Sequence, residues 1–270
     1  MSEAVEIVSV RTVVGEVIIS GHDHVAVEEP LRIQVWHGPL TKRVLAQVGT
    51  TMRTPGHDTD LVAGFLFTDR SIHQAADVLD IKAVQPNVVR VTLHPDVPWH
   101  SIKTRGTIHS SCGVCGRKVI EDLEMRLDQV PPCGELNPNL IHQLSQRLRE
   151  AQPAFDRTGG LHAAALFDLS GELLLAREDV GRHNAVDKVI GAEFRAGRVP
   201  LRNRLLFVSG RASFELVQKA VAAGATALAA VGAPSSLAVE LARRFGLTLI
   251  GFVRDLRFNV YTAEESPNDG

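Results

Sequence analysis

The second half of the sequence, from about residue 163 to residue 252, alternates short apolar runs with longer amphipathic segments. The short runs have the length of strands, and the amphipathic segments place apolar residues at helical spacing. Successive strand-loop-helix units favour a largely parallel sheet with helices on both faces, so the pattern predicts a three-layer α/β/α domain. The expected strands are residues 163–169, 173–176, 204–208, 227–231 and 248–252, and the expected helices are residues 184–195, 213–223 and 236–245.

The first half has a different pattern, because apolar and polar side chains alternate there as they do in half-buried strands. Pro55-Gly56 then breaks the chain, and Asp58 can cap a helix that follows. We therefore predict a smaller N-terminal α+β domain over residues 1–105 and the three-layer domain over residues 106–270. The other elements expected are strands at residues 13–19, 31–36 and 83–93, a turn at residues 21–23, and helices up to residue 69 and at residues 117–129 and 139–151.

Charge and composition exclude several classes of protein. The 29 Lys and Arg residues nearly balance the 31 Asp and Glu residues of the 270-residue chain, which argues against a dedicated nucleic-acid-binding protein. Three cysteines are too few for a disulfide framework and suit a reducing compartment. The first residues lack the basic and apolar regions of a signal peptide, and the uncharged stretch at residues 220–239 is interrupted by Gly and Pro. We expect a soluble, cytoplasmic protein that binds neither nucleic acid nor membrane.

The sharpest chemical feature is a pair of thiols, Cys112 and Cys115, in a loop that contains several glycines. Nearby positive charge, from side chains such as Arg105 and Arg117, favours the thiolate form. Three interpretations are open. The pair could be half of a zinc site completed by Cys133 and His142, a redox dithiol of the thioredoxin type, or a nucleophile that carries sulfur as a persulfide. Each of the three requires a thiolate, so the nearby positive charge does not separate them.

Three loops are expected to meet at one edge of the predicted sheet, namely residues 209–211, 232–236 and 251–257. Helix N-termini at such an edge offer free N–H groups to phosphates, and Arg211, Arg254 and Arg257 could add charge. The loops contain no P-loop and no dinucleotide-binding glycine fingerprint, so an ATPase or NAD enzyme is not indicated. The alternative is that residues such as Ser213 and Ser236 are ordinary helix caps.

Residues 178–188 form the densest polar stretch, in which His183 and Asp187 share one helical face with Asn184 and Lys188 beside them. It is either a solvated helix start with local ion pairs or a ligand-facing polar helix. Another polar segment contains His162, but Ala164 stands where zinc nucleoside deaminases have their Glu, and no cysteine pair follows. If the deaminase scaffold is present, its chemistry is absent.

Together these motifs resemble one family, the FdhD/NarQ proteins, which are formate dehydrogenase accessory sulfurtransferases. The resemblance is strong from about Met52 to Thr262 and weaker before that. The matching segments are Met52-Arg53-Thr54-Pro55-Gly56, Ser110 to Gly116, Thr158 to Ala164, Glu178 to Gly191, Ser209 to Glu215 and Ala233 to Ala238.

The resemblance implies a sulfur carrier with a cytidine deaminase-like larger domain. A cysteine desulfurase would load a persulfide on Cys112, with Cys115 as a helper, and the sulfur would pass to a molybdenum cofactor before it enters formate dehydrogenase. That cofactor, molybdenum held by two molybdopterin guanine dinucleotides, is a bound substrate, and no permanent metal is expected. The family also implies a homodimer with a pocket for a guanine nucleotide. The alternative is a cofactor-binding chaperone without covalent chemistry. The residues expected to contact the cofactor are Phe252, Val253, Arg254, Asp255, Leu256, Arg257, Ser209, Gly210, Arg211, His183 and Lys188.

Overall fold

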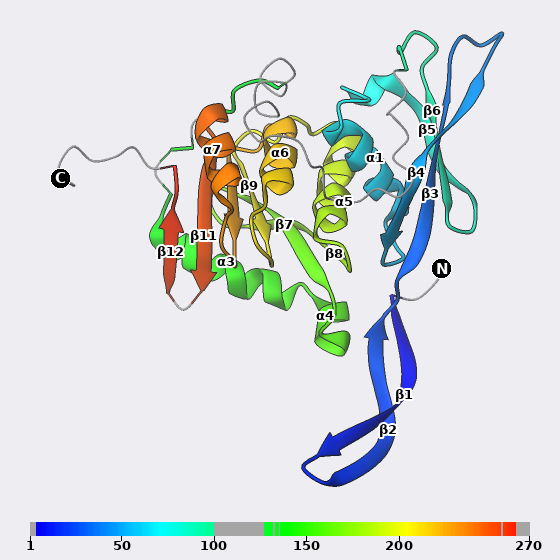
Figure 1. Ribbon diagram of the computed structural model, residues 1–270. Helices are drawn as coiled ribbons and strands as arrows, with labels where there is room; N and C mark the ends of the chain where they lie inside the picture. Colours follow the sequence, from blue (N-terminus) through cyan, green and yellow to red (C-terminus); the bar gives the residue numbers. More distant parts are fainter. Residues whose placement is uncertain (1–3, 100–126, 132, 135, 255, 263–270) are drawn as a thin grey trace.

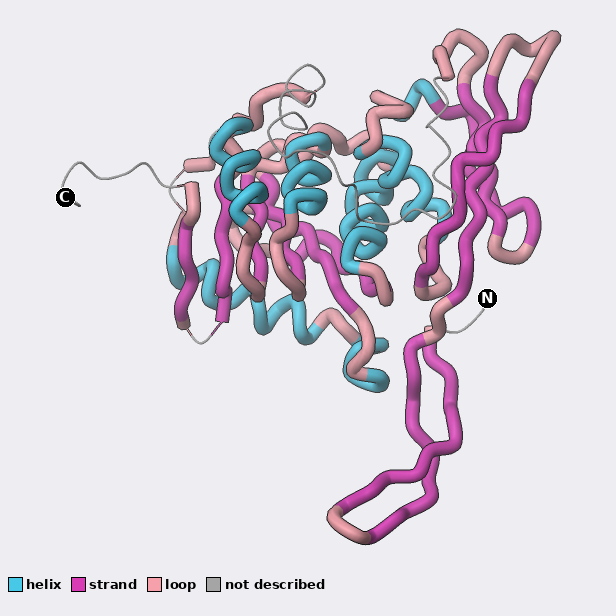
Figure 2. Tube along the Cα trace, in the orientation of Figure 1, coloured by secondary structure: helices cyan, strands magenta, loops and turns pink. Residues whose placement is uncertain are grey.

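A computed structural model of the chain describes residues 4–99, 127–131, 133–134, 136–254 and 256–262. It contains a six-stranded sheet, a four-stranded sheet and a separate two-stranded hairpin (Figures 1 and 2). No helix in these ranges is both long and apolar enough to cross a membrane. The strands are β1 (Val5–Val14), β2 (Val17–Ala26), β3 (Glu29–His37), β4 (Val44–Arg53), β5 (Val78–Gln85), β6 (Val88–Leu93), β7 (His162–Asp168), β8 (Leu173–Asp179), β9 (Arg204–Val208), β10 (Ala227–Ala230), β11 (Thr248–Arg254) and β12 (Arg257–Val260). The helices are α1 (Asp58–Thr68), α3 (Pro138–Glu150), α4 (Pro153–Thr158), α5 (Arg182–Arg195), α6 (Phe214–Ala222) and α7 (Ser236–Phe245), with a short 3₁₀ turn η1 (Ala75–Asp77).

The six-stranded sheet has the order β12-β11-β10-β9-β7-β8. Strands β9, β10 and β11 are parallel, whereas β7, β8 and β12 run antiparallel to their neighbours. The expectation of a largely parallel sheet therefore holds only for its centre. Each outer part contains a hairpin, β7–β8 at one side and β11–β12 at the other, and a hairpin connection makes antiparallel neighbours.

Alternate residues of the central strands point to opposite faces of this sheet and bury against different helices. Ala163, Ala165 and Phe167 of β7 belong to a core cluster with residues of α3, whereas Ala164 and Leu166 belong to the cluster that contains α5, α6 and α7. Figure 1 shows α3 on one side of the sheet and the other three helices on the opposite side. The predicted three-layer α/β/α arrangement is confirmed.

The smaller sheet has the order β4-β3-β6-β5 and packs one face against α1. Residues 83–93, expected as one strand, form the end of β5, a turn and β6 instead. Asn87 in this turn has a left-handed φ of 57°, which Asn adopts more readily than most residues. Two short strands on either side of a tight turn give the same alternation as one long strand, so the pattern could not separate them.

The hairpin of β1 and β2 extends away from the rest of the chain (Figure 1). The prediction of one strand over residues 13–19, followed by a turn at residues 21–23, is therefore wrong. The chain turns at Gly15, which has a φ of 61°, and residues 21–23 lie inside β2. The apolar residues around the turn are exposed, so the turn is set by glycine geometry and not by the burial pattern.

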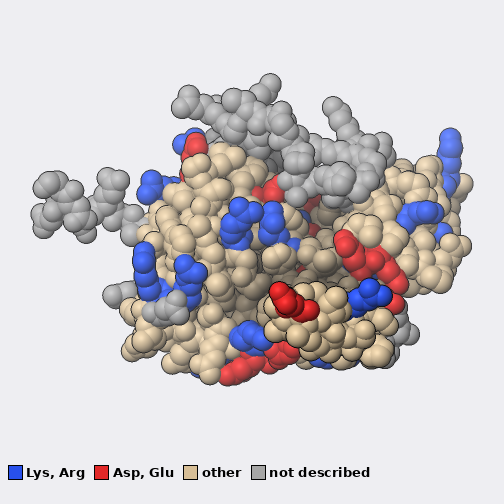
Figure 3. Space-filling model, turned by 60° about the horizontal axis from the view of Figure 1, so that its bottom comes forward, with Lys and Arg blue, Asp and Glu red and all other residues tan. Residues whose placement is uncertain are grey.

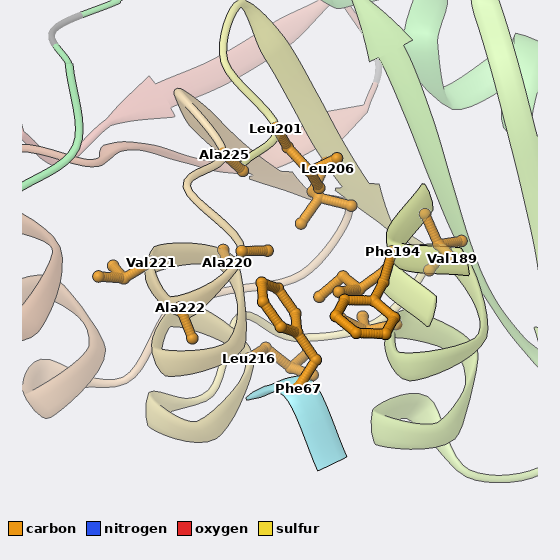
Figure 4. Close-up of a cluster of buried hydrophobic side chains, with 14 of the residues drawn as sticks. Phe67, Val189, Phe194, Leu201, Leu206, Leu216, Ala220, Val221, Ala222 and Ala225 are labelled. Carbon is orange, nitrogen blue, oxygen red and sulfur yellow. The ribbon is translucent and has the colours of Figure 1, made fainter. Parts of the chain in front are cut away.

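The two sheets share one hydrophobic core, because α1 lies between the smaller sheet and α5. Phe67 of α1 packs at a tilt against Phe194 of α5 with ring centroids 5.0 Å apart, and Leu216 of α6 lies beside them (Figure 4). The predicted domain boundary at residues 105 and 106 and most of the helix expected over residues 117–129 lie outside the described residues. Residues 127–129 are described and are not helical.

Candidate functional site at the sheet edge

The carboxyl ends of β9, β10 and β11 meet at one edge of the six-stranded sheet, as the sequence predicts. Backbone hydrogen bonds join the three loops that follow these strands: the Gly232 N–H donates to the Gly210 carbonyl at 2.9 Å, and the Phe252 N–H donates to the Gly232 carbonyl at 3.1 Å. The first loop also continues β7, because the Ser209 N–H donates to the Ala163 carbonyl at 3.0 Å. Residues from four strands therefore form one surface.

Glycine makes this close approach possible. A Cβ on Gly232 would lie 3.0 Å from the Gly210 carbonyl oxygen, and one on Gly251 would lie 3.0 Å from the Pro234 Cδ. The next residue, Phe252, is held at a left-handed φ of 56°, which is strained for a residue with a side chain. Strain of this kind is commonly found at binding sites, so the β11–β12 hairpin is a candidate for ligand contact.

Arginine side chains mark the end of this hairpin. Arg254 and Arg257 lie directly opposite each other in the β11–β12 register, and both are exposed. Like charges at opposed positions repel, and among the described residues neither guanidinium forms an ion pair. An anion between them would relieve this repulsion. Leu256 is 82% exposed, Val253 is buried in the core, and Asp255 lies outside the described residues.

Three helices begin at the same edge, with Gly181, Ser213 and Ser235 at the N-cap positions of α5, α6 and α7. The Ser235 Oγ accepts a hydrogen bond from the Ala238 N–H at 3.3 Å, so Ser235 and not Ser236 is the cap of α7. The Ser213 Oγ is buried and has no hydrogen-bond partner among the described residues. Free N–H groups of helix N-termini attract anions, so this edge is suited to phosphate groups.

His162 stands at the start of β7, close enough to Gly210 that a Cβ there would lie 3.5 Å from the His162 Nδ1. Burial, followed by the positive charges of Arg182 and His183, lowers the pKa of His162. The His183 Nε2 lies 2.9 Å from a Glu215 carboxylate oxygen, and this contact lowers the pKa of Glu215 despite its partial burial. Two imidazoles, a guanidinium and a carboxylate therefore lie together next to the loops.

Lys188 is not part of this surface. Its side chain is 1% exposed, and its Nζ lies 2.7 Å from the Asp179 carboxylate and donates to the Thr54 carbonyl at 2.9 Å. The Nζ also donates to the Glu178 carbonyl at 3.2 Å, so all three hydrogens of the ammonium group are used inside the protein. The prediction that Lys188 contacts the cofactor is therefore wrong. The polar stretch at residues 178–188 is thus neither a solvated helix start nor wholly ligand-facing: much of it binds the N-terminal part of the chain.

Sequence reasoning missed three residues of the site, Asp179, Arg182 and Glu215. All three lie within the motifs that the sequence singled out, but a carboxylate in a polar stretch gives no sign that it is completely buried, as Asp179 is. The Arg182 Nε is also buried and has no hydrogen-bond partner among the described residues. Only the packing of the loops brings these groups together.

The two candidate thiols of the sequence, Cys112 and Cys115, lie outside the described residues. Cys133 is described and partly buried beside the α3 face of the sheet, and burial raises the pKa of its thiol. His142 stacks at a tilt on Phe258, with ring centroids 5.2 Å apart. Within the described ranges no three His, Cys, Asp or Glu side chains are grouped in a way that could hold a metal ion.

Charge is not concentrated over the face shown in Figure 3, where acidic and basic side chains lie in separate small groups. A shallow hollow near Ser170, at the opposite end of β7 from His162, is lined by Arg147 but also by Glu150 and Glu172. These carboxylates disfavour an anion, so the hollow does not compete with the sheet edge as a phosphate site.

The fold and the site define a class: a three-layer α/β protein with an anion-suited sheet edge, joined through a shared core to a small N-terminal sheet. The sequence profile of the FdhD/NarQ family matches residues 26–267, and the chain belongs to this family. It is 46% identical over 257 residues to the sulfur carrier protein FdhD of Streptomyces avermitilis, which covers 90% of this chain and 88% of that protein. It is 44% identical over 247 residues to the protein of the same name from Sulfolobus acidocaldarius, with coverage of 91% and 92%.

The fold is also found in a crystal structure from Desulfotalea psychrophila, that of a protein described as a formate dehydrogenase accessory protein. The TM-score is 0.76 at 24% sequence identity, with 97% of this chain and 99% of that chain covered. At this identity the likeness concerns the fold, and it extends over both sheets.

Proposed function

We propose that this chain is a sulfur carrier for the molybdenum cofactor of formate dehydrogenase. Its relatives bear the name of a sulfur carrier, and the sheet edge has the donors that the pyrophosphates of two molybdopterin guanine dinucleotides require. The observation that carries the binding half of the proposal is the opposed pair Arg254 and Arg257, two exposed cations that lack an ion-pair partner within the described residues. The cofactor is the substrate of this reaction.

The residues at the edge fit such a ligand. Arg211 is exposed next to the α6 N-terminus, and Gly210 and Gly232 leave their backbone uncovered by side chains of their own. His162 and His183 stand beside them, and each can donate a hydrogen bond to a phosphate oxygen. The guanine-nucleotide ends of the cofactor are the parts that these groups would hold.

The covalent half of the proposal rests on Cys112. Its thiolate attacks the outer sulfur of a persulfide on a cysteine desulfurase, so that a bond forms between the Cys112 Sγ and that sulfur while the desulfurase thiolate leaves. Release of the carried sulfur as sulfide needs two electrons. Cys115 supplies them when its thiolate attacks the Cys112 Sγ, which forms a disulfide and frees sulfide for the molybdenum. A cellular dithiol then reduces the disulfide.

Intact mass spectrometry tests the covalent half after incubation of the protein with a cysteine desulfurase and cysteine. We expect a gain of one sulfur atom that reductant removes, that is lost in Cys112→Ala and that is kept in Cys133→Ala. Retained sulfur on Cys112→Ala would overturn the assignment of the carrier thiol. Stoichiometric zinc on the same sample without added sulfur would favour the cofactor-binding chaperone with a structural dithiol. A reversible Cys112–Cys115 disulfide with neither bound sulfur nor released sulfide would favour a redox pair.

We further propose that the protein acts in the cytoplasm as a homodimer that uses the β1–β2 hairpin as a contact surface. Val13, Val14, Val17, Ile18 and Ile19 surround the hairpin turn, and each side chain is more than half exposed. An isolated two-stranded ribbon is marginally stable in water, and exposed apolar strands favour association. A second copy of the chain carries an identical ribbon, so the exposed apolar side chains of the two hairpins can cover each other.

A further inference from the structure

Asp179, the last residue of β8, joins three segments although it is completely buried. One carboxylate oxygen accepts the Gly181 N–H at 2.8 Å and the Asn184 Nδ2 at 2.9 Å. The other accepts the Thr54 N–H at 3.2 Å and lies 2.7 Å from the Lys188 Nζ. A buried carboxylate is tolerated only when it is paired in this way, so its four partners are fixed in place together.

Two further hydrogen bonds are donated from residues near the start of α5 to the N-terminal part of the chain. The Val180 N–H donates to the Thr54 Oγ1 at 3.1 Å, and the Asn184 Nδ2 donates to the Met52 carbonyl at 2.7 Å. The end of β4 and the residue that follows it are therefore bound directly to the N-terminus of α5. This segment belongs to the N-terminal part of the chain, whereas α5 belongs to the three-layer part.

The first turn of α5 carries two residues of the candidate site, Arg182 and His183. They lie between Gly181 and Asn184, both of which donate to the Asp179 carboxylate. Arg182 and His183 both lower the pKa of His162. His162 itself lies opposite Asp179 in the β7–β8 register. The placement of all three side chains relative to the sheet-edge loops thus depends on where Asp179 holds the start of α5.

We propose that Asp179 is a positioning residue for the anion site, which it builds by fixing the first turn of α5 between the sheet edge and residues 52–54 at the end of β4. The inference rests on the proposed function and adds to it: the nucleotide site is shared between the two parts of the chain, although Asp179 does not touch the ligand. Loss of the carboxylate frees the α5 N-terminus and weakens the binding of a guanine nucleotide.

A second buried pair on the same helix provides a matched control. The Lys219 Nζ donates to both oxygens of the Asp187 carboxylate, each at 2.8 Å, and the Thr68 Oγ1 donates to one of them at 3.1 Å. This pair also joins α5 to the N-terminal part of the chain, through α1. Asp187 lies more than one helical turn beyond the α5 N-terminus, and its side-chain hydrogen bonds within the described residues go to Lys219 and Thr68. Its interaction with His183 is electrostatic only, so it does not hold the first turn of α5 in place.

The experiment compares Asp179→Asn with Asp187→Asn by calorimetric titration with guanosine diphosphate, at a temperature where circular dichroism shows both variants to be folded. We expect both variants to unfold at lower temperature than the wild type. Only Asp179→Asn should raise the Kd, by about tenfold or more, because it loses the hydrogen bonds to a buried charged group that fix the first turn of α5. Persulfide loading on Cys112 should be unchanged in both.

An unchanged Kd in Asp179→Asn, or an equal rise in both variants, would overturn the positioning role. If Asp179→Asn does not fold, Thr54→Ala carries the test, because it removes only the acceptor of the Val180 N–H; a rise in Kd of about two- to tenfold is expected, and an unchanged Kd would overturn the inference. A wild-type protein that binds no guanosine diphosphate would instead overturn the proposed nucleotide site itself, and the shared site with it.

Discussion

Gly64 of α1 and Gly191 of α5 face each other where the two helices cross. A Cβ on Gly191 would lie 1.8 Å from the Asp60 carbonyl oxygen and 2.5 Å from the Gly64 nitrogen, and a Cβ on Gly64 would lie 1.9 Å from the Asp187 carbonyl oxygen. The helices therefore touch through their backbones. This contact brings the smaller sheet close enough for the turn after β4 to reach Asp179.

Gly191→Ala should separate α1 from α5. The added methyl group cannot be accommodated by a side-chain movement, because the atoms it meets are backbone atoms, so we expect a loss of about 1–3 kcal/mol or more in the free energy of unfolding. Denaturant unfolding measures the change. Gly21→Ala is the control, since a Cβ there meets nothing within 4 Å and the residue has no left-handed φ. Equal stability of the two variants would contradict the tight crossing.

His162 should make stability depend on pH. Its pKa in the folded protein lies below the usual value of 6.5 because of burial and the neighbouring Arg182 and His183. The unfolded chain therefore binds the proton more tightly, so the contribution of neutral His162 is complete above 6.5 and is lost as the pH falls through the lowered pKa. The Tm of the wild type measured between about pH 5 and pH 8 should fall more steeply toward acid than that of His162→Gln. Parallel curves would contradict this role.

An anion at the sheet edge should reverse the same shift. Negative charge next to the imidazole favours its protonated form, so guanosine diphosphate should raise the pKa of His162. NMR titration of the His162 ring with and without the nucleotide measures this change, and His142, which stacks on Phe258 on the α3 side of the sheet, serves as the internal reference. An unmoved His162 pKa at saturating nucleotide would place the ligand elsewhere.

Arg53, in the first of the family motifs, should be a structural residue. It is 2% exposed, and two of its nitrogens each donate to an Asp58 carboxylate oxygen at 2.9 Å, while another donor hydrogen reaches the Asn87 side-chain oxygen at 2.7 Å. Arg53→Gln leaves these acceptors without their partner and should cost about 1–3 kcal/mol of stability. Nucleotide affinity, measured well below the Tm, should remain close to that of the wild type. A loss of affinity without a loss of stability would assign Arg53 to the site instead.

Ile18→Asp should weaken self-association of the chain. Ile18 lies opposite Val13 on one face of the β1–β2 ribbon and is 65% exposed, so a carboxylate there would be buried without a partner in a dimer. Sedimentation equilibrium measures the shift toward monomer. His22→Asp adds the same charge to the same ribbon outside the apolar group around the turn, where His22 lies opposite Ser9, and should leave the dimer intact because it removes no apolar area. Dimers of equal stability would show that the ribbon is not the interface.

The sequence by itself determined the three-layer domain, the convergence of three loops at its sheet edge and the family, because hydrophobic periodicity and the order of short motifs are local properties. It misplaced the hairpin turn at Gly15 and merged β5 with β6, since one alternating pattern fits either one strand or two. Only the tertiary structure decided that Lys188 is an internal partner and not a ligand contact. The role of an ionisable side chain depends on what surrounds it, and Asp179 and Thr54, its partners, lie 125 residues apart in the sequence.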